Sequence, residues 1–218
     1  HSLAVVRALE AEGGFGLAAR LALVAGHSLG EYSALTAAGA FDIATAAKLL
    51  RLRGEAMQKA TPPGTGAMAA LLGAEIDLAQ EICAAAATNP ETGKAEVVEA
   101  ANDNGGGQVV ISGAKAAVER AIEIAKEKRV KRAMLLPVSA PFHCALMAPA
   151  ADAMAEALAG ATMQAPAVPV VANVSAAKAT DPAEIRDLLV RQVTGTVRWR
   201  ECVAAMAAMG CDKFVEVG

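Results

Sequence analysis

Apolar and polar positions alternate along the chain with two periods, which predicts short buried strands followed by amphipathic helices. The apolar run over 21–25 is typical of a buried strand, and a helical pattern follows it to about Ala38, where Gly39 ends it. Asp42, a preferred N-cap residue, then stands before a second helical pattern over 43–59. This part of the chain is therefore expected to fold as strand, helix and helix.

One charged residue interrupts the apolar stripe of the helix expected over 43–59. Arg53 shares that stripe with Ala46, Leu49 and Met57, so its guanidinium should point toward the core. A buried guanidinium without an anionic partner is costly. Two interpretations stay open. Arg53 forms a structural salt bridge or snorkels to the surface, or it is a clamp whose planar fork binds the carboxylate of a ligand.

The pattern changes between Gly66 and Val138, where four apolar runs alternate with two helical patterns. Strands are predicted over 67–72, 96–100, 108–112 and 132–138, helices over 77–87 and 115–128, and a loop over 102–107. The order β-α-β-β-α-β is that of a ferredoxin-like unit. We therefore expect residues 66–138 to form a ferredoxin-like subdomain inserted into a larger domain of residues 1–65 and 139–218.

The larger domain resumes at Ser139, and His143 opens a helix that should run to about Leu158. A strand over 168–174, helices over 183–193 and 197–209 and a strand over 213–218 complete the pattern. Strands that alternate with helices favour a parallel sheet covered by helices. The predicted fold class is therefore α/β, with a parallel sheet in the larger domain.

The turn after the first predicted strand carries a G-x-S-x-G pattern, Gly26-His27-Ser28-Leu29-Gly30. In this pattern the serine occupies a strained strand-to-helix turn, and both glycines are expected to remove side chains where strand and helix come close. The helix N-terminus offers free N–H groups and a partial positive charge that suit an oxyanion. Ser28 is thus a candidate nucleophile, and an inert serine in a structural turn is the alternative.

A serine nucleophile needs a neighbouring base, and the chain has only three histidines. His1 is terminal, and His27 is adjacent to Ser28 on the turn, where neighbouring side chains should diverge. His143 remains, in a strand-to-helix loop of the kind in which α/β folds place chemistry. No Asp or Glu stands convincingly at the end of a main-domain strand between Ser28 and His143. We therefore expect another acceptor, such as a backbone carbonyl, to orient the imidazole; a loop histidine without a catalytic role is the alternative.

Charge and composition exclude several classes of function. The net charge of −3 and the pI of about 5.7 argue against nucleic acid as the main partner. No run is long and apolar enough to span a membrane. The four cysteines lack C-x-x-C spacing, which favours buried thiols in a reducing, cytoplasmic compartment over disulfides or a metal site. The basic cluster over 126–132 is a solvated helix end or a docking surface for an acidic protein.

Six stretches carry these candidates and their surroundings: 26–33 (GHSLGEYS), 52–58 (LRGEAMQ), 64–68 (GTGAM), 107–113 (GQVVISG), 137–143 (PVSAPFH) and 190–192 (VRQ). In this order they resemble the malonyl-CoA:acyl carrier protein transacylases, which are acyltransferases of fatty acid biosynthesis. The resemblance covers essentially the whole chain. It implies an α/β-hydrolase-like large domain and a ferredoxin-like small one.

The resemblance also assigns roles to residues. Ser28 would be the acylated nucleophile, His143 its general base, and Arg53 the partner of the malonyl carboxylate. The other implied site residues are Leu29, whose N–H would bind the oxyanion, Gln192, whose backbone carbonyl would receive the His143 N–H, Phe142, and Asn102 and Asn104 near the cleft. Phe142 and Leu29 resemble the residues of malonyl-selective members, in which a bulky Phe crowds a branched acyl group.

The implied reaction moves a malonyl group from malonyl-CoA to the phosphopantetheine thiol of acyl carrier protein. It proceeds by a ping-pong cycle through a malonyl-serine ester and needs no metal or redox cofactor. The implied partners are therefore malonyl-CoA and acyl carrier protein. We expect a monomer that binds neither nucleic acid nor a membrane.

The chain departs from the family at both ends. The family has an N-terminal strand with a Gly-Gln-Gly-Ser-Gln motif and continues past Gly218 into a Gly-Pro-Gly turn, so the chain is expected to be an internal portion of the enzyme. Two other functions stay open. One is a serine esterase or thioesterase on the same core, with an acid bonded to His143. The other is a catalytically weak fragment that acts as a carrier-binding module.

Overall fold

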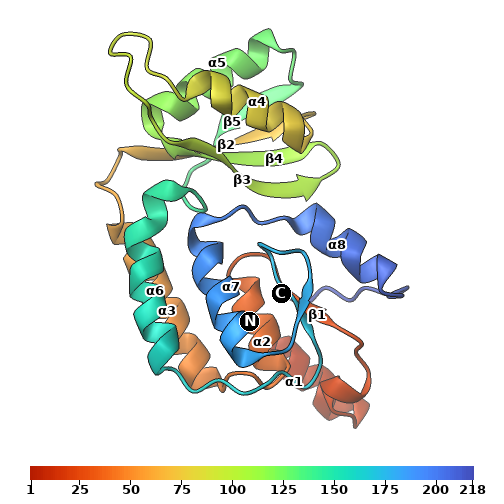
Figure 1. The fold of residues 1–218 in the computed structure, drawn as a ribbon. Helices are drawn as coiled ribbons and strands as arrows, with labels where there is room; N and C mark the ends of the chain where they lie inside the picture. Colours follow the sequence, from red (N-terminus) through yellow and green to blue (C-terminus); the bar gives the residue numbers. More distant parts are fainter.

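The computed structural model describes residues 1–218 as an α/β molecule with two parts (Figure 1). The larger part contains a three-stranded sheet and most of the helices, and the smaller part, at the top of Figure 1, contains a four-stranded sheet. The chain crosses from the larger part to the smaller one after α3 (Ile43–Lys59) and returns after β5 (Arg132–Leu135).

The larger part packs helices around a small mixed sheet. Its helices are α1 (Ser2–Gly13), α2 (Gly30–Ala37), α3, α6 (Ala148–Gly160), α7 (Pro182–Thr194) and α8 (Trp199–Ala208), with 3₁₀ turns at Leu17–Ala19 and Ala145–Met147. Strand β1 (Val24–Ala25) pairs in parallel with β6 (Val170–Val171), and β6 pairs antiparallel with β7 (Lys178–Ala179). The prediction of a parallel sheet is therefore wrong at β7. Only six residues join β6 to β7, too few for the crossover that a parallel neighbour needs.

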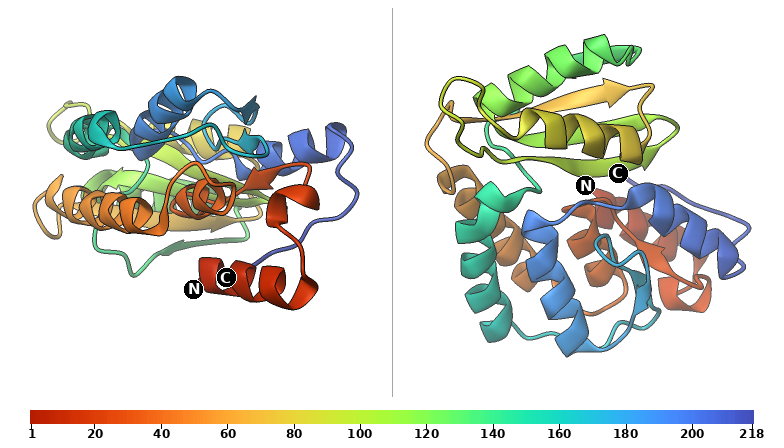
Figure 2. Two further views of the ribbon diagram at one scale, coloured as in Figure 1. Left: turned by 90° about the horizontal axis from the view of Figure 1, so that it is seen from below. Right: turned by 45° about the horizontal axis from the view of Figure 1, so that its top comes forward.

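The smaller part is an antiparallel sheet covered on one face. Its strands are β2 (Gly66–Leu72), β3 (Val98–Gly105), β4 (Gln108–Ala114) and β5, in the order β3-β4-β2-β5. Helices α4 (Ile76–Ala86) and α5 (Lys115–Glu127) cover the face turned away from the larger part (Figures 1 and 2). The element order is the predicted β-α-β-β-α-β.

Each part has its own hydrophobic core. The core of the larger part joins α2, α3, α6 and α7 through fully buried side chains such as Leu35, Met154 and Leu189. The core of the smaller part lies between its sheet and α4 and α5, with Leu71, Ile82 and Ile111 fully buried. Three of the four free cysteines are buried and Cys211 is half-buried. Each part therefore packs around its own core, and the chain crossings after α3 and β5 join the two parts.

Several element boundaries differ from the sequence prediction. Asn102 to Gly105 extend β3 and are not part of a loop, because bulges at two points of the β3–β4 pair let the polar residues continue the ladder. The terminal stretch 213–217 pairs with no strand, and Phe214 and Val215 are exposed. Helix α6 begins at Ala148, so His143 lies on irregular chain ahead of it. Two of these differences concern strands, whose pairing depends on partners far along the chain, and one concerns the start of a helix.

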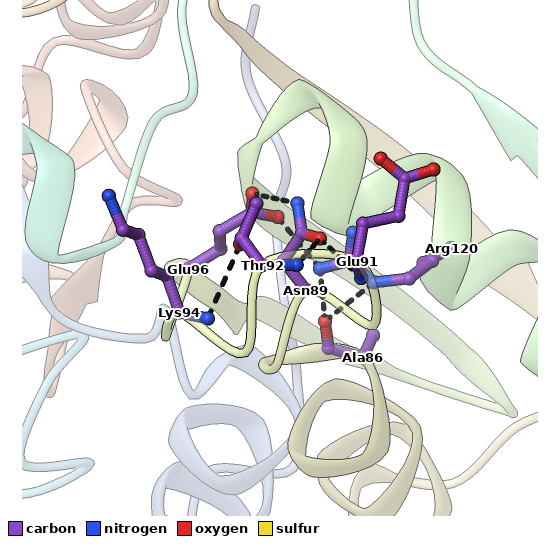
Figure 3. A network of polar contacts seen from close by, with 7 residues as sticks. All are labelled: Ala86, Asn89, Glu91, Thr92, Lys94, Glu96 and Arg120. Atoms are coloured by element: carbon purple, nitrogen blue, oxygen red, sulfur yellow. Dashed lines mark hydrogen bonds and ion pairs between the residues drawn. The ribbon is translucent and has the colours of Figure 1, made fainter.

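A polar network fastens the loop between α4 and β3 to α5 (Figure 3). The Arg120 guanidinium donates to the carbonyl of Ala86 at 2.7 Å and 3.1 Å and pairs with Glu96 at 2.7 Å. Asn89 donates to the same Glu96 carboxylate at 3.0 Å. The network satisfies a carbonyl at the end of α4 that has no partner within the helix. It stiffens the smaller part without touching the elements that join it to the larger one.

Candidate active site

Ser28 lies in the tight turn between β1 and α2, in a strained backbone conformation. Its φ is +52°, a left-handed value that non-glycine residues rarely adopt. At Gly26, a Cβ would lie 2.0 Å from the carbonyl oxygen of Gly30, so only glycine fits there. A Cβ at Gly30 would meet nothing within 4 Å, so the expectation that both glycines relieve a clash is wrong for Gly30. The turn thus requires one glycine and holds the Ser28 side chain clear of the strand.

Asn173, just after β6, holds this turn in place. Its Oδ1 accepts the N–H of Ser28 at 2.7 Å, and its Nδ2 donates to the carbonyl of Gly26 at 2.9 Å. Asn173 is fully buried. Because both bonds go to backbone groups of the turn, Asn173 substitutes for the regular hydrogen bonds that a strained turn lacks.

His143 meets the Ser28 hydroxyl. Its Nε2 is 2.7 Å from Ser28 Oγ, and its Nδ1 is 2.8 Å from the backbone carbonyl oxygen of Gln192. A carbonyl oxygen can only accept, so Nδ1 carries the proton and Nε2 is free to accept the Ser28 hydroxyl proton. The pair has the geometry of a nucleophile and a general base, with a carbonyl in the place of a triad acid.

The surroundings of His143 keep its imidazole neutral. The residue is 4% exposed, and burial, reinforced by the nearby charge of Arg53, lowers its pKa from 6.5 to about 4. Its φ of +58° is also left-handed. A neutral imidazole at ordinary pH is the form that can take a proton from Ser28.

Arg53 reaches the same hydroxyl from α3. Its Nη2 donates to Ser28 Oγ and to Gln192 Oε1, each at 3.1 Å, while its buried Nε has no hydrogen-bond partner. The side chain lies 6.0 Å from the ring centre of Tyr32 and forms no salt bridge with an acid. Burial lowers the pKa of its guanidinium, although an arginine stays charged at any ordinary pH. Arg53 therefore has the unused donor capacity that an anionic ligand would satisfy.

Gln192 connects these groups. It lies in the last turn of α7 and is fully buried. Its backbone oxygen binds His143, and its side-chain Oε1 binds Arg53. Its Nε2 donates to the Ser28 carbonyl at 3.0 Å and to Glu31 Oε2 at 2.9 Å. One residue thus contacts the nucleophile, the base and the cation.

The remaining predicted residues lie around this centre with fewer contacts. Leu29 is 55% exposed at the start of α2, and Phe142 is partly buried against the core of the larger part. Asn104 Oδ1 is 2.9 Å from Nε2 of His27, whose ring packs edge-on against Trp199. Asn102 is buried in β3, where its backbone bridges to Val197, and no side-chain hydrogen bond joins it to Ser28, His143 or Arg53.

Sequence reasoning missed two polar residues of the site, Asn173 and Glu31. Asn173 precedes Val174 and Ser175, and together they match a glycosylation pattern and no catalytic motif. Glu31 falls within the G-x-S-x-G helix but follows no recognisable catalytic spacing. A signal was present in both cases, because each polar residue adjoins an apolar stretch that had to be buried.

A neutral base, His143, and a cation, Arg53, both lie within hydrogen-bond distance of the hydroxyl oxygen of the candidate nucleophile Ser28. No three His, Cys, Asp or Glu side chains group closely enough to hold a metal ion. No helix reaches the length and apolar character needed to cross a membrane. The chemistry that these residues can perform is acyl transfer to and from Ser28, with preference for an acyl group that carries an anion.

Comparison with known proteins finds similarity to acyltransferases along the whole chain. The model of the acyl transferase domain family matches residues 2–218. The malonyl CoA-acyl carrier protein transacylase of Escherichia coli K12 is 48% identical over 217 residues, which are 100% of this chain and 67% of that protein. The crystal structure of the acyl-carrier-protein-S-malonyltransferase from Bartonella henselae is similar with a TM-score of 0.93 and 52% identity, covering 100% of this chain and 67% of that one.

A second similar structure contains a carrier protein. It is a type II polyketide synthase acyl-carrier protein in complex with its malonyl-transacylase, with a TM-score of 0.92 and 43% identity over 100% of this chain and 67% of that one. The chain thus spans about two thirds of the length of these relatives.

Proposed function

The chain belongs to the acyl transferase domain family, and on this premise we propose that it transfers a malonyl group from malonyl-CoA to the phosphopantetheine thiol of an acyl carrier protein. Fatty acid biosynthesis is the pathway that uses this product. The names of the similar proteins support both the donor and the acceptor. The rest of the proposal concerns how the residues of this chain would carry out the reaction.

The observation that carries the proposal is the position of Arg53. Its Nη2 is 3.1 Å from Ser28 Oγ, the same oxygen that His143 Nε2 contacts at 2.7 Å. In a malonyl thioester, one methylene separates the free carboxylate from the carbonyl carbon that Ser28 would attack. A cation that binds this carboxylate must therefore lie close to the nucleophile. An acetyl thioester has no group to satisfy the unpaired donors of Arg53.

Acylation begins when the malonyl carboxylate pairs with Arg53 and the thioester carbonyl reaches Ser28. Ser28 Oγ attacks the carbonyl carbon while His143 Nε2 takes the hydroxyl proton. The N–H of Leu29, at the start of α2, would stabilise the oxyanion. Collapse breaks the carbon–sulfur bond, and the protonated His143 returns its proton to the departing CoA thiolate. A malonyl-serine ester remains.

Transfer reverses these steps with a different thiol. His143 removes the proton from the phosphopantetheine thiol of the carrier protein, and the thiolate attacks the Ser28 ester. Collapse of the tetrahedral intermediate releases Ser28, which recovers its proton from His143. The proposed cycle needs no metal or redox cofactor. His143 carries every proton, Arg53 binds the malonyl carboxylate, and a backbone N–H stabilises the oxyanion.

Several finer expectations belong to this proposal. The larger part would be α/β-hydrolase-like, supported by the strand-turn-helix that carries Ser28, and residues 66–138 would be ferredoxin-like, supported by the sheet order β3-β4-β2-β5. Phe142 and Leu29 would disfavour a branched acyl group, a preference of about 1–3 kcal/mol for one methyl group. Asn104 would border the cleft beside His27. Asn102 would act only through the backbone of β3.

Mass spectrometry of the protein that carries this chain tests the proposal. Mixing it with malonyl-CoA should add one malonyl group to Ser28, and holo acyl carrier protein should then remove it. The Ser28→Ala variant should form no adduct. Free malonate released without a carrier protein would indicate a hydrolase instead, and carrier binding without any adduct would indicate a binding module.

A further inference from the structure

Glu31 is a buried carboxylate to which the proposed mechanism gives no role. It lies on α2, three residues after Ser28, and is 1% exposed. Its Oε2 accepts two hydrogen bonds, from the backbone N–H of Asn173 at 3.0 Å and from Nε2 of Gln192 at 2.9 Å. Burial raises the pKa of Glu31 to about 7, while these two hydrogen bonds and the charge of Arg53 act in the opposite direction.

The two residues that Glu31 binds are the two that organise the site. Gln192 holds the His143 ring through its backbone oxygen and Arg53 through its side chain. Asn173 holds the backbone of the turn that carries Ser28. One carboxylate oxygen therefore contacts both supports of the site without contacting the nucleophile, the base or the cation.

Glu31 and the Ser28 carbonyl, which both accept from Nε2 of Gln192, decide together which way the Gln192 amide faces. Oε2 of Glu31 is the acceptor of two N–H groups, whereas a guanidinium can only donate. With Glu31 on one side and Arg53 on the other, the amide must turn its NH₂ toward Glu31 and its oxygen toward Arg53. In the reverse orientation the amide oxygen would face the Glu31 oxygen, and the amide NH₂ would face the Arg53 guanidinium, so neither pair could form a hydrogen bond. With its NH₂ bound to Glu31, Gln192 presents its amide oxygen to Arg53 as an acceptor.

We propose that Glu31 is a positioning residue for malonyl transfer: through the Gln192 amide it holds Arg53 where the malonyl carboxylate will bind, and through Asn173 it braces the Ser28 turn. The inference rests on the proposed function, because it concerns how that reaction selects its acyl group. It predicts that loss of the Glu31 carboxylate impairs the acceptance of malonyl more than the acceptance of an uncharged acyl group.

Glu31→Gln is the direct test, since it keeps the shape and removes the anionic acceptor. Single-turnover acylation of Ser28 is measured with malonyl-CoA and with acetyl-CoA, and thermal unfolding shows whether the variant is folded. The ratio of malonyl to acetyl acylation rates should fall about tenfold or more, the size expected when a hydrogen bond to a charged group is lost. A role confined to stability would lower both rates equally and leave the ratio unchanged, which would overturn the proposal.

Two further variants isolate the path through Gln192. Gln192→Met keeps the backbone carbonyl for His143 and cuts the amide link, so the same ratio should fall; it keeps the inference testable if Glu31→Gln does not fold. In an Arg53→Ala background, Glu31→Gln should leave the ratio unchanged, because the residue through which it acts is gone. An undiminished ratio in Gln192→Met, or a full additional loss in the double variant, would contradict the inference.

The control is Glu55→Gln, which neutralises an exposed carboxylate on α3 that pairs only with Arg51. It should leave both acylation rates as they are. A wild-type protein that forms no malonyl adduct would overturn the proposed function and this inference with it. A wild type that prefers malonyl, together with a Glu31→Gln variant that keeps the same preference, would overturn the inference alone.

Discussion

At the scale of single residues, the hydrogen bonds around the Ser28 hydroxyl can run in one direction only. The Gln192 carbonyl accepts, so His143 must donate from Nδ1 and accept at Nε2. Arg53 only donates, so Ser28 Oγ receives a hydrogen bond from Arg53 and gives its proton to His143. The direction of every bond around Ser28 is therefore determined by neighbours that cannot reverse. A site ordered in this way is ready for acylation before the substrate arrives.

Arg53 is the residue on which acyl selectivity should depend. Arg53→Ala should lower acylation by malonyl-CoA about 10²-fold, because the charge-assisted hydrogen bonds to the carboxylate are lost, and should lower acylation by acetyl-CoA much less. The measurement is single-turnover acylation with each donor. Arg51→Ala, an exposed arginine on the same helix, is the control and should change neither rate. An unchanged malonyl-to-acetyl ratio in Arg53→Ala would refute the clamp.

His143 should titrate far below an ordinary histidine. Burial and the charge of Arg53 lower its pKa to about 4, so it stays neutral and able to accept a proton well below pH 6.5. A ring-carbon NMR titration, assigned with His143→Ala, should give a midpoint near pH 4. The unfolded chain binds this proton near pH 6.5, whereas the folded chain binds it only near pH 4. His143 should therefore make unfolding easier as pH falls from 6.5 toward 4. A midpoint near 6.5 would contradict the burial of the ring.

Gly26 and Gly30 look equivalent in the G-x-S-x-G pattern but differ in space. A Cβ at Gly26 would overlap the backbone of Gly30, so Gly26→Ala should lower the free energy of unfolding by more than about 3 kcal/mol and abolish acylation. A Cβ at Gly30 meets nothing, and alanine favours a helix by about 0.5–1 kcal/mol over glycine. Gly30→Ala should thus keep or raise stability. Urea unfolding measures the free energy of unfolding of both variants. Equal losses in the two variants would contradict the inferred difference in packing around the two glycines.

At the scale of elements, most helices and the strands of the smaller part were predictable, whereas β7 was not. The helix at 43–59 has the expected ends, and Asp42 caps it by accepting the N–H of Thr45, because cap and period are local properties of sequence. The strands β1, β6 and β7 are two residues long, and β7 has no apolar alternation to reveal it. Arg53 could be found because its burial follows from helical period. Asn173 could not be placed, because it meets Ser28 across 145 residues of chain.

The N-cap of α7 should stabilise the helix that carries Gln192. The Asp181 side chain accepts the N–H groups of Ala183 and Glu184, each at 2.9 Å. Asp181→Ala should lower the free energy of unfolding by about 1 kcal/mol, the usual loss for an N-cap. Asp187→Ala, on the exposed face of the same helix, removes only a surface ion pair with Arg191 and should have little effect. Thermal unfolding compares the two, and an equal loss would exclude a capping role.

At the scale of the molecule, the two parts meet along β3 and the chain that leads into α8. The backbone N–H of Asp103 donates to the Val197 carbonyl at 2.9 Å, and the Val197 N–H donates to Ala101 at 2.8 Å. Thr196 Oγ1 adds a bond to the Ala100 carbonyl at 2.6 Å. The sequence predicted the two parts from their internal patterns. The sequence contained no sign of this seam. The seam residues follow neither the helical nor the strand period, and they pair across about 95 positions of chain.

The ion pair between Arg200 and Asp103 closes this seam and offers the last test. Arg200 donates to Asp103 Oδ2 from Nε at 2.9 Å and lies 2.8 Å away through Nη2, and the Asp103 side chain is 2% exposed. Arg200→Ala leaves a buried carboxylate with only the Gly105 N–H at 3.3 Å. Because Arg200 is itself partly exposed, the loss should be modest, about 1 kcal/mol or roughly fivefold in the local opening equilibrium.

Hydrogen exchange can localise that loss to the seam. In Arg200→Ala the amides of Asp103 and Val197, which cross between the parts, should exchange roughly fivefold faster, whereas amides of the β2–β4 ladder should not change. Arg191→Ala, which removes an exposed arginine of the larger part, is the matched control and should leave the seam protected. Faster exchange throughout the smaller part would mean that Arg200 stabilises its fold instead of its docking. Unchanged exchange at Asp103 and Val197 would mean that the backbone bonds alone hold the two parts together along the seam.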